Sequence, residues 1–176
     1  AALERTRELL VYLPARWTPR RLCSRFGLKA NVDFSHERMI RTVMDDEDQW
    51  FAASAEHVPE LLDRSAVEAR RVYEDRGLHG MDLRRYLAFA VHYRHRFGRL
   101  PDSGYWTFLL AGAYDRSGVS IAGFDRNGVL SHHGWMRNYR AAFCGSRYAV
   151  LAPRIEVTPE TSRLRRAYRD GKGPPT

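Results

Sequence analysis

The chain has few cysteines, almost no lysine and no long apolar run. Its 176 residues include two cysteines, Cys23 and Cys144, and neither belongs to a Cys-x-x-Cys pair. This scarcity excludes a disulfide scaffold and the usual zinc-ligand spacings, and it favours thiols that serve as small apolar groups in a reducing compartment. One bridge between the two cysteines stays an alternative. Since no stretch of about 18 apolar residues occurs, the sequence predicts no membrane span.

Recognisable catalytic motifs are also missing. The sequence contains no P-loop, no Gly-x-Gly-x-x-Gly and no Gly-x-Ser-x-Gly, and nothing in it brings His132 or His133 to a cysteine or serine nucleophile. His92 and His95 are spaced so that two imidazoles could bind one metal ion, but the arginines around them would repel a cation. We therefore predict no catalytic residue, no metal site, no cofactor and no small-molecule substrate.

What the chain has in abundance is arginine, which accounts for 27 of its 29 basic residues. Arginine presents a planar, permanently charged fork that binds phosphate through two hydrogen bonds and stacks on bases. Codon usage in a GC-rich genome would produce the same bias. Under either explanation, the net charge of +8 favours a polyanionic partner.

The charge is unevenly distributed along the chain. Residues 1–32 carry a net charge of +5, residues 33–82 a net charge of −7, and residues 83–176 a net charge of +10. This separation predicts contact with polyanions at both ends and contact with proteins, or with solvent, in the acidic middle.

The first half of the chain has mostly helical patterning. We predict helices over 3–12, 19–26, Ser35 to Phe51, Pro59 to Gly77, and 82–97.

The helix over 19–26 has the clearest boundaries. Thr18 offers an N-cap hydroxyl, Pro19 has the φ of a first helical residue, and Gly27 can adopt the left-handed conformation that ends a helix. Its periodicity places Leu22, Cys23 and Phe26 on an inner face and the arginines on an outer one. In the helix over 82–97, the same reasoning places Arg84, Arg85, His92, His95 and Arg96 outside.

From Leu100 onward glycine becomes frequent, and the runs VSIAGF (119–124) and YAVLAPRIEV (148–157) favour strands. The sequence Asp-Arg-Asn-Gly at 125–128 predicts a hairpin turn. The predicted fold class is mainly α. It consists of a helical domain over 1–98, with about four helices and a start like a helix-turn-helix, a small irregular α+β region over 99–157, and a basic C-terminal extension over 158–176.

Three basic clusters are candidates for binding RNA, because each could neutralise several phosphates while nearby aromatic rings stack on bases. A solvated surface is the alternative for any one cluster alone. The candidate aromatic residues are Trp17, Tyr93, Tyr139, Tyr148 and Tyr168. The predicted RNA-binding residues are Arg16, Arg20, Arg21, Arg25, Lys29, Arg84, Arg85, Arg96, Arg163, Arg165, Arg166 and Arg169.

Two segments, RRLCSRFGL (20–28) and MIRTVMDDEDQW (39–50), together resemble a helix-turn-helix. They are similar to a segment of the eukaryotic mitochondrial regulator family of mitochondrial small-subunit ribosomal proteins, in which a Phe-Gly turn precedes a helix that ends in acidic residues, glutamine and tryptophan. The matching positions are Leu22, Phe26, Gly27, Leu28, Met39, Ile40 and Trp50. The resemblance implies a ribosomal protein. The connection over 29–37 is longer than in a helix-turn-helix, which argues against groove reading in DNA.

These observations predict a structural constituent of a mitochondrial ribosome. It would bind ribosomal RNA through its arginine clusters and neighbouring ribosomal proteins through its acidic middle, in the mitochondrial matrix. The sequence begins without methionine, as after removal of an import signal, although a chain shortened in another way would begin the same way. The alternatives are an accessory subunit of another large mitochondrial complex, such as a respiratory complex or ATP synthase, and a helix-turn-helix DNA-binding regulator.

Overall fold

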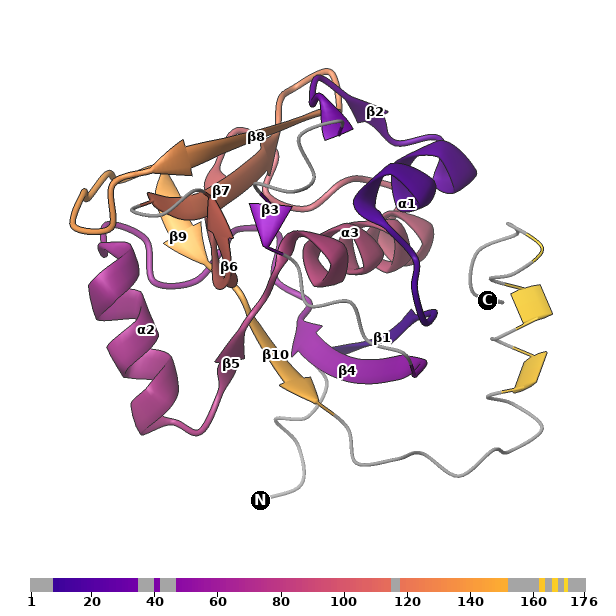
Figure 1. Cartoon of the computed structure of the whole chain (residues 1–176), viewed down its shortest axis with the longest axis horizontal. Helices are drawn as coiled ribbons and strands as arrows, with labels where there is room; N and C mark the ends of the chain where they lie inside the picture. Colours follow the sequence, from indigo (N-terminus) through magenta and orange to yellow (C-terminus); the bar gives the residue numbers. More distant parts are fainter. Residues whose placement is uncertain are drawn as a thin grey trace.

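The computed structural model describes residues 8–34, 40–41, 47–114, 118–151, 162–163, 166–167 and 170. Within them the chain forms two β-sheets and three helices (Figure 1). The elements follow one another as β1 (Glu8–Leu13), α1 (Pro19–Phe26), β2 (Lys29–Ala30), β3 (Ile40–Arg41), β4 (Gln49–Ser54), α2 (Ala66–Asp75), β5 (His79–Gly80), α3 (Leu83–Phe97), β6 (Trp106–Tyr114), β7 (Gly118–Phe124), β8 (Val129–Trp135), β9 (Cys144–Ser146) and β10 (Tyr148–Leu151).

The four-stranded sheet has the strand order β1-β4-β10-β5, and its neighbouring strands are antiparallel. β1 lies at one edge of this sheet. Nε2 of His92, on α3, lies 3.2 Å from both the backbone nitrogen and the backbone oxygen of Tyr12 in β1. Since one ring nitrogen either accepts from the N–H or donates to the oxygen, this buried side chain serves one of two backbone groups that an edge strand would otherwise leave without a partner.

The six-stranded sheet has the order β2-β8-β7-β6-β3, and β9 also pairs with β6. Alternate side chains of β6 and β7 point to opposite faces, and both faces are covered. Leu109 and Ala122 belong to the core around α3, whereas Phe108 and Ile121 pack in a second core with α2. Because both faces are buried, these strands are nearly continuous apolar runs in the sequence.

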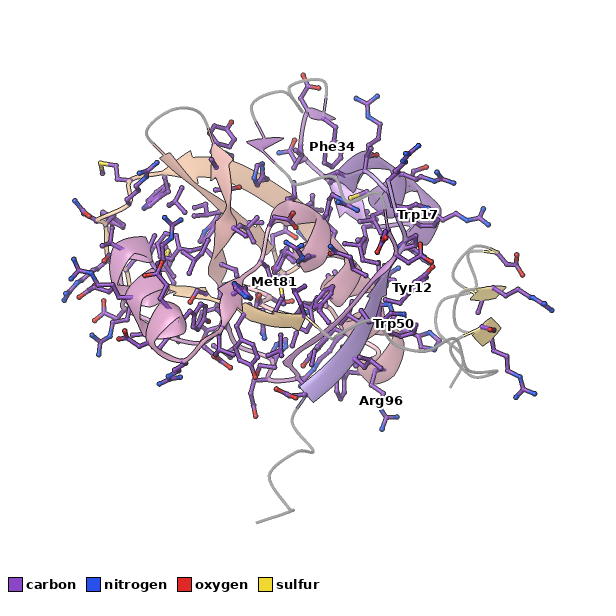
Figure 2. The ribbon with its side chains drawn as sticks, turned by 60° about the horizontal axis from the view of Figure 1, so that its bottom comes forward. Tyr12, Trp17, Phe34, Trp50, Met81 and Arg96 are labelled. Carbon is purple, nitrogen blue, oxygen red and sulfur yellow. The ribbon has the colours of Figure 1, made fainter. Side chains whose placement is uncertain are left out.

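Helix α3 is the centre of the larger core. Every residue from Leu83 to Tyr93 is buried, as expected of a helix that is covered on all sides. It packs against β1, β6 and α1. Figure 2 shows Met81, just before α3, in the middle of the molecule and Arg96, in its last turn, at the edge. Only the C-terminal end of α3 reaches the surface.

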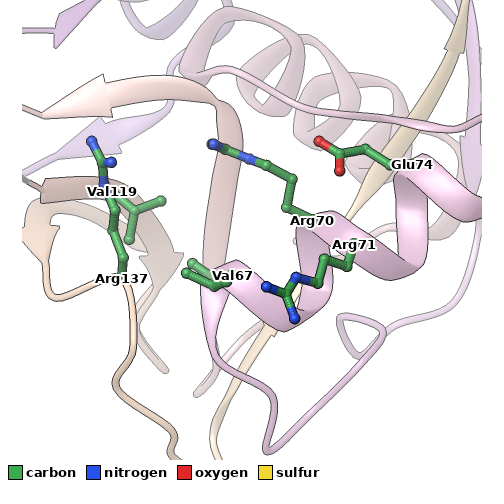
Figure 3. Close-up of a pocket in the computed structure, with 7 residues that line it drawn as sticks. Val67, Arg70, Arg71, Glu74, Val119 and Arg137 are labelled. Carbon is green, nitrogen blue, oxygen red and sulfur yellow. The ribbon is translucent and has the colours of Figure 1, made fainter.

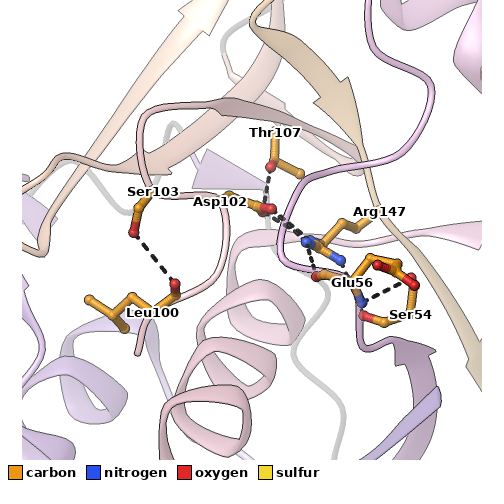
Figure 4. A network of polar contacts seen from close by, with 7 residues as sticks. All are labelled: Ser54, Glu56, Leu100, Asp102, Ser103, Thr107 and Arg147. Atoms are coloured by element: carbon orange, nitrogen blue, oxygen red, sulfur yellow. Dashed lines mark hydrogen bonds and ion pairs between the residues drawn. The ribbon is translucent and has the colours of Figure 1, made fainter. Parts of the chain in front are cut away.

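Arg147 lies where the chain passes from β9 in one sheet to β10 in the other. Its buried guanidinium group pairs with Asp102 at 2.6 Å and donates hydrogen bonds to the backbone oxygens of Ser54 and Glu56 (Figure 4). Thr107 donates to the other carboxylate oxygen of Asp102. Burial alone would lower the pKa of Arg147, but the Asp102 carboxylate outweighs burial and raises it. The network ties the two sheets together, and removing one charge would leave the other buried and unpaired.

The prediction of a mainly α fold with a four-helix bundle is wrong, because the protein is a mixed α/β structure with two sheets. Segments 1–98 and 99–157 contribute strands to both sheets. The region expected to be small and irregular provides β6, β7, β8 and β9, most of the six-stranded sheet. Leucine-rich and alanine-rich runs favour helices locally, but pairing with distant strands overrides that preference.

Three of the predicted helices are wrong or misplaced. The described part of the helix predicted over 3–12 is β1. The helix predicted from Ser35 to Phe51 is replaced, where the structure describes it, by β3 and the start of β4, so the helix-turn-helix is absent at those positions. The helix predicted from Pro59 to Gly77 is α2, which begins at Ala66, after the N-cap Ser65, rather than at Pro59.

Other local predictions are confirmed. Helix α1 has the predicted boundaries, and α3 begins after Asp82 and ends before Gly98. The turn at 125–128 joins β7 and β8 in an antiparallel hairpin, with a φ of 73° at Gly128. Cys23 and Cys144 are both free and buried. Among the described residues, no helix combines the length and apolar character needed to cross a bilayer.

Candidate nucleic-acid interface

The candidate interface is built on α1, whose two ends are fixed by its own sequence. The hydroxyl oxygen of Thr18 accepts a hydrogen bond from the backbone N–H of Arg21 at 3.1 Å. At the other end, Gly27 has a φ of 59°, and its backbone N–H bonds to the carbonyl oxygen of Cys23. A helix of eight residues is marginal by itself, so its position depends on what it packs against.

Two arginines of α3 hold α1 against the core. Nε of Arg84 donates to the backbone oxygen of Trp17, just before α1, at 2.8 Å. The guanidinium group of Arg94 donates to the backbone oxygens of Phe26 and Gly27 at the end of α1. Because the start of α1 meets the start of α3 and the end meets the end, the two helices run in the same direction. The carbonyls at the C-terminal end of α1 gain a cationic partner, which is favourable there.

Every charged residue of α1 and its flanks, from Pro14 to Val32, is basic. We call the surface they form the α1 basic face, and it is defined by five exposed side chains with no acidic residue between Leu13 and Asp33. The guanidinium carbon of Arg21 lies 4.7 Å from the centre of the Trp17 ring, a cation–π arrangement that leaves the planar fork accessible. The five residues are Arg16, Arg20, Arg21, Arg25 and Lys29.

Two of the predicted RNA-binding residues, both in the first turn of α3, do not face solvent. Arg84 is 0% exposed and Arg85 is 9% exposed. Arg85 pairs with Asp82 and donates to the side-chain oxygen of Gln49. His92, also expected outside, is 3% exposed, and burial lowers its pKa to about 3. These outward predictions are wrong because α3 is covered on all sides, so none of its first three turns is a surface.

The remaining predicted residues divide into two groups. Arg96 is exposed in the last turn of α3, and Arg163 and Arg166 are exposed in the C-terminal segment. Arg165 and Arg169 lie outside the described residues.

Two of the aromatic residues proposed for stacking are buried and a third is half-buried. Trp17 and Tyr93 are buried, and Tyr148 packs edge-on against Tyr73. Tyr139 is exposed, in the connection between β8 and β9, and Tyr168 lies outside the described residues. The α1 basic face therefore offers phosphate contacts and no fully exposed ring.

The acidic middle is also partly structural. Asp48, the last residue of the acidic run, accepts hydrogen bonds from the Tyr12 hydroxyl at 2.7 Å and from the backbone N–H of Ala15 at 3.0 Å. This carboxylate therefore fixes the chain that leads into α1. Asp45 and Asp46 lie outside the described residues.

Other groups with chemical potential are buried or dispersed. Ser120 and His132 share a hydrogen bond but are both buried, and burial lowers the pKa of His132 to about 4. Cys23 is buried, which raises the pKa of its thiol to about 12. Within the described part of the chain, no three histidine, cysteine, aspartate or glutamate side chains come together as metal ligands. The geometry therefore favours the α1 basic face as the candidate site.

Sequence reasoning missed two sets of basic residues. Arg94 anchors α1, and nothing in its local pattern shows which carbonyls it meets. Arg70, Arg71 and Arg137 line a pocket at α2. The doublet at 70–71 could have drawn attention as positive charge in a net acidic segment, but its proximity to Arg137 is a tertiary feature.

No family model, no curated protein and no solved structure matches this chain. The functional argument therefore depends on the residues and geometry described above.

Proposed function

We propose that the protein is a non-catalytic RNA-binding subunit of a ribonucleoprotein particle, and that it binds RNA through the α1 basic face. The observation that carries the proposal is the exposure of five basic side chains on one short helix and its flanks, with no acidic residue among them. Such a surface binds phosphates by charge and by arginine forks. Because phosphate contacts carry no sequence information, binding through this face should depend little on the RNA sequence.

The anchoring of α1 supports the same proposal. Arg84 and Arg94 hold the backbone at the two ends of the helix. The outer arginines therefore stand on a fixed frame, and less conformational entropy is lost when they bind. Arg94 contributes to the frame rather than to the outer surface, so its role differs from that of Arg20 or Arg21.

The proposed particle is the mitochondrial ribosome. This part of the proposal is carried by the sequence resemblance of residues 20–28 and 39–50, of which the first segment includes most of α1 and the second forms β3 and the start of β4 where the structure describes it. If it is correct, the endogenous protein sediments with ribosomal particles through a sucrose gradient and leaves them at high salt. Migration with membrane extracts, or in fractions without RNA, would contradict it.

RNA binding is tested with a triple variant, Arg20→Gln, Arg21→Gln and Arg25→Gln. The matched control removes three exposed arginines elsewhere, by Arg64→Gln, Arg76→Gln and Arg126→Gln, and so has the same net charge. Fluorescence anisotropy with a structured RNA should show affinity about tenfold or more weaker for the α1 variant than for the control. The slope of log affinity against log salt should also fall, by up to about 2 to 3.

Equal loss of affinity in both triple variants would show a nonspecific effect of net charge and would overturn the assignment to α1. So would unchanged binding by the α1 variant. A marked preference of the wild-type protein for one RNA sequence would contradict the prediction of phosphate contact alone.

A further inference from the structure

A second basic feature lies at α2, at the other end of the molecule from α1 in Figure 1. It is a pocket of about 210 Å³ between α2, β7 and the connection from β8 to β9. Val67 and Val119 provide apolar lining, and three arginines surround them. Figure 3 shows Arg70 and Arg137 extending over the same side of Val67, with Arg71 beside it. We call this feature the α2 pocket.

The frame of the α2 pocket is fixed by several bonds. Glu68 accepts hydrogen bonds from the backbone and the hydroxyl of Ser65, which completes a capping box at the start of α2. The same carboxylate pairs with Arg140, in the connection between β8 and β9. The backbone oxygen of Arg137 accepts from the backbone N–H of Val67 at 3.3 Å. These contacts fasten the connection to α2 on one side of the pocket.

Arg70, a side chain of the pocket, is itself bound to the six-stranded sheet. Nη2 of Arg70 donates to the backbone oxygen of Leu110 in β6 at 2.8 Å. This bond restrains the guanidinium group while its remaining N–H groups stay available for another acceptor. Arg70 is therefore positioned before any ligand arrives.

The positive charge of the α2 pocket is only partly compensated by its lining carboxylate. The side chains of Arg71 and Arg137 make no hydrogen bond or ion pair with the residues that the structure describes. Glu74 also lines the pocket but forms no ion pair with its arginines within that same part of the chain. Three guanidinium groups and one carboxylate give the pocket a net charge of +2.

We propose that the α2 pocket binds a terminal phosphate group, as found in a phosphomonoester. At neutral pH such a group carries a charge of about −1.5 to −2 and has three strong acceptor oxygens. It therefore matches both the net charge and the number of arginine forks, which bind phosphate oxygens in pairs. A single carboxylate would balance only half of the charge.

The size of the pocket limits the ligand. Sites for drug-sized molecules have volumes of about 300 to 1,000 Å³, so about 210 Å³ suits a phosphate with a small attached group. Two sources share this chemistry: a small phosphorylated compound and the 5′-phosphate end of an RNA strand. A small phosphorylated compound would be a ligand of a class that the sequence patterns do not predict.

The test is calorimetric titration of the full chain with phosphate ligands at constant ionic strength. The ligands are inorganic phosphate, adenosine 5′-monophosphate, and a short RNA with either a 5′-phosphate or a 5′-hydroxyl. The variants are Arg71→Gln and Arg137→Gln, whose side chains have no hydrogen-bond or ion-pair partner among the described residues. The matched control is Arg126→Gln, in the turn between β7 and β8 and outside the pocket.

We expect each pocket variant to weaken binding of the phosphate ligands about tenfold, with the control unchanged. Tighter binding of the monophosphate identifies a small molecule as the source, and tighter binding of the 5′-phosphorylated RNA identifies an RNA end. Equal weakening by Arg126→Gln would overturn the proposal. It would also be overturned if the two RNAs bound with the same affinity and neither inorganic phosphate nor the monophosphate bound. The triple variant of α1 leaves the α2 pocket intact, so the failure of one proposal is distinguishable from the failure of the other.

Discussion

Helices α1 and α3 begin with the same local sequence arrangement, but the first turn of α1 is exposed at its arginines and the first turn of α3 is buried. Each has an oxygen-bearing N-cap, one intervening residue and then two arginines, so that Arg20 and Arg21 occupy the same helical positions as Arg84 and Arg85. The first pair is exposed and the second is buried. The contrast shows that burial of an arginine is decided by what packs around a helix and not by its position on it.

The two pairs therefore have different roles. Arg84 donates a hydrogen bond inside the protein to the backbone oxygen of Trp17, and so stabilises the position of α1. The guanidinium groups of Arg20 and Arg21 lie at the surface, where a partner can reach them. The exposed charges of α1 depend on the buried charge of α3 for their placement.

The largest expected effect comes from removing the buried member of this comparison. Arg84→Ala deletes the hydrogen bond to Trp17 and leaves space in the core, so it should lower the free energy of unfolding by about 3 kcal/mol or more. Arg20→Ala, at the equivalent helical position, should change it by less than about 0.5 kcal/mol. Urea denaturation at pH 7.5 measures both. Similar losses for the two variants would contradict the contrast in burial.

An intermediate effect concerns the buried histidines, above all His92 of α3. His92 is buried, which lowers its pKa to about 3, so the unfolded chain binds a proton below about pH 6.5 while the folded protein does not. Stability should therefore fall as the pH drops from 6.5 toward 3, by up to about 1.4 kcal/mol per pH unit for each such histidine. His132 adds to the slope over a narrower range, since its pKa is lowered to about 4.

The measurement is urea denaturation between pH 7.5 and pH 5. His92→Gln should make the decline with falling pH shallower, whatever its effect on stability at pH 7.5. His79→Gln, at an exposed position of β5, is the control and should leave the decline as in the wild type. An unchanged decline in His92→Gln would show that His92 is not the responsible group.

The smallest expected effect is at the N-cap of α1. Thr18→Ala removes the acceptor for the backbone N–H of Arg21 and should cost about 1 kcal/mol. Thr18→Ser keeps the hydroxyl and should cost much less. Thermal unfolding of both variants measures the difference, and equal destabilisation would mean that the cap bond contributes little.

The sequence predicted those features that depend on neighbouring residues. Helix α1, with Thr18 and Gly27 at its ends, was predicted at its observed boundaries, and so was the turn at 125–128, because caps and turns are made by residues close together in the chain. The segments that became β1 and β4 were misassigned. Their register, which pairs Tyr12 with Trp50, joins residues 38 positions apart, and no local pattern specifies it.

The candidate site divides in the same way. The five residues of the α1 basic face could be predicted because an amphipathic helix with defined ends reveals its outer side. The α2 pocket could not, because Arg137 reaches Arg70 and Arg71 only after β8 has been placed beside β7. Arg84 and Arg85 were misplaced because the helical period identifies the faces of α3 but not how many of them are covered.

By itself, the sequence determined the helix boundaries of α1 and α3, the hairpin turn, the burial of the two thiols and the positive charge of α1. Only the tertiary structure decided which arginines face solvent and which hold the fold, since a guanidinium group forms internal hydrogen bonds or stays at the surface according to the neighbours that pack around it. Its charge is permanent, so it must be paired where it is buried and can bind a polyanion where it is not.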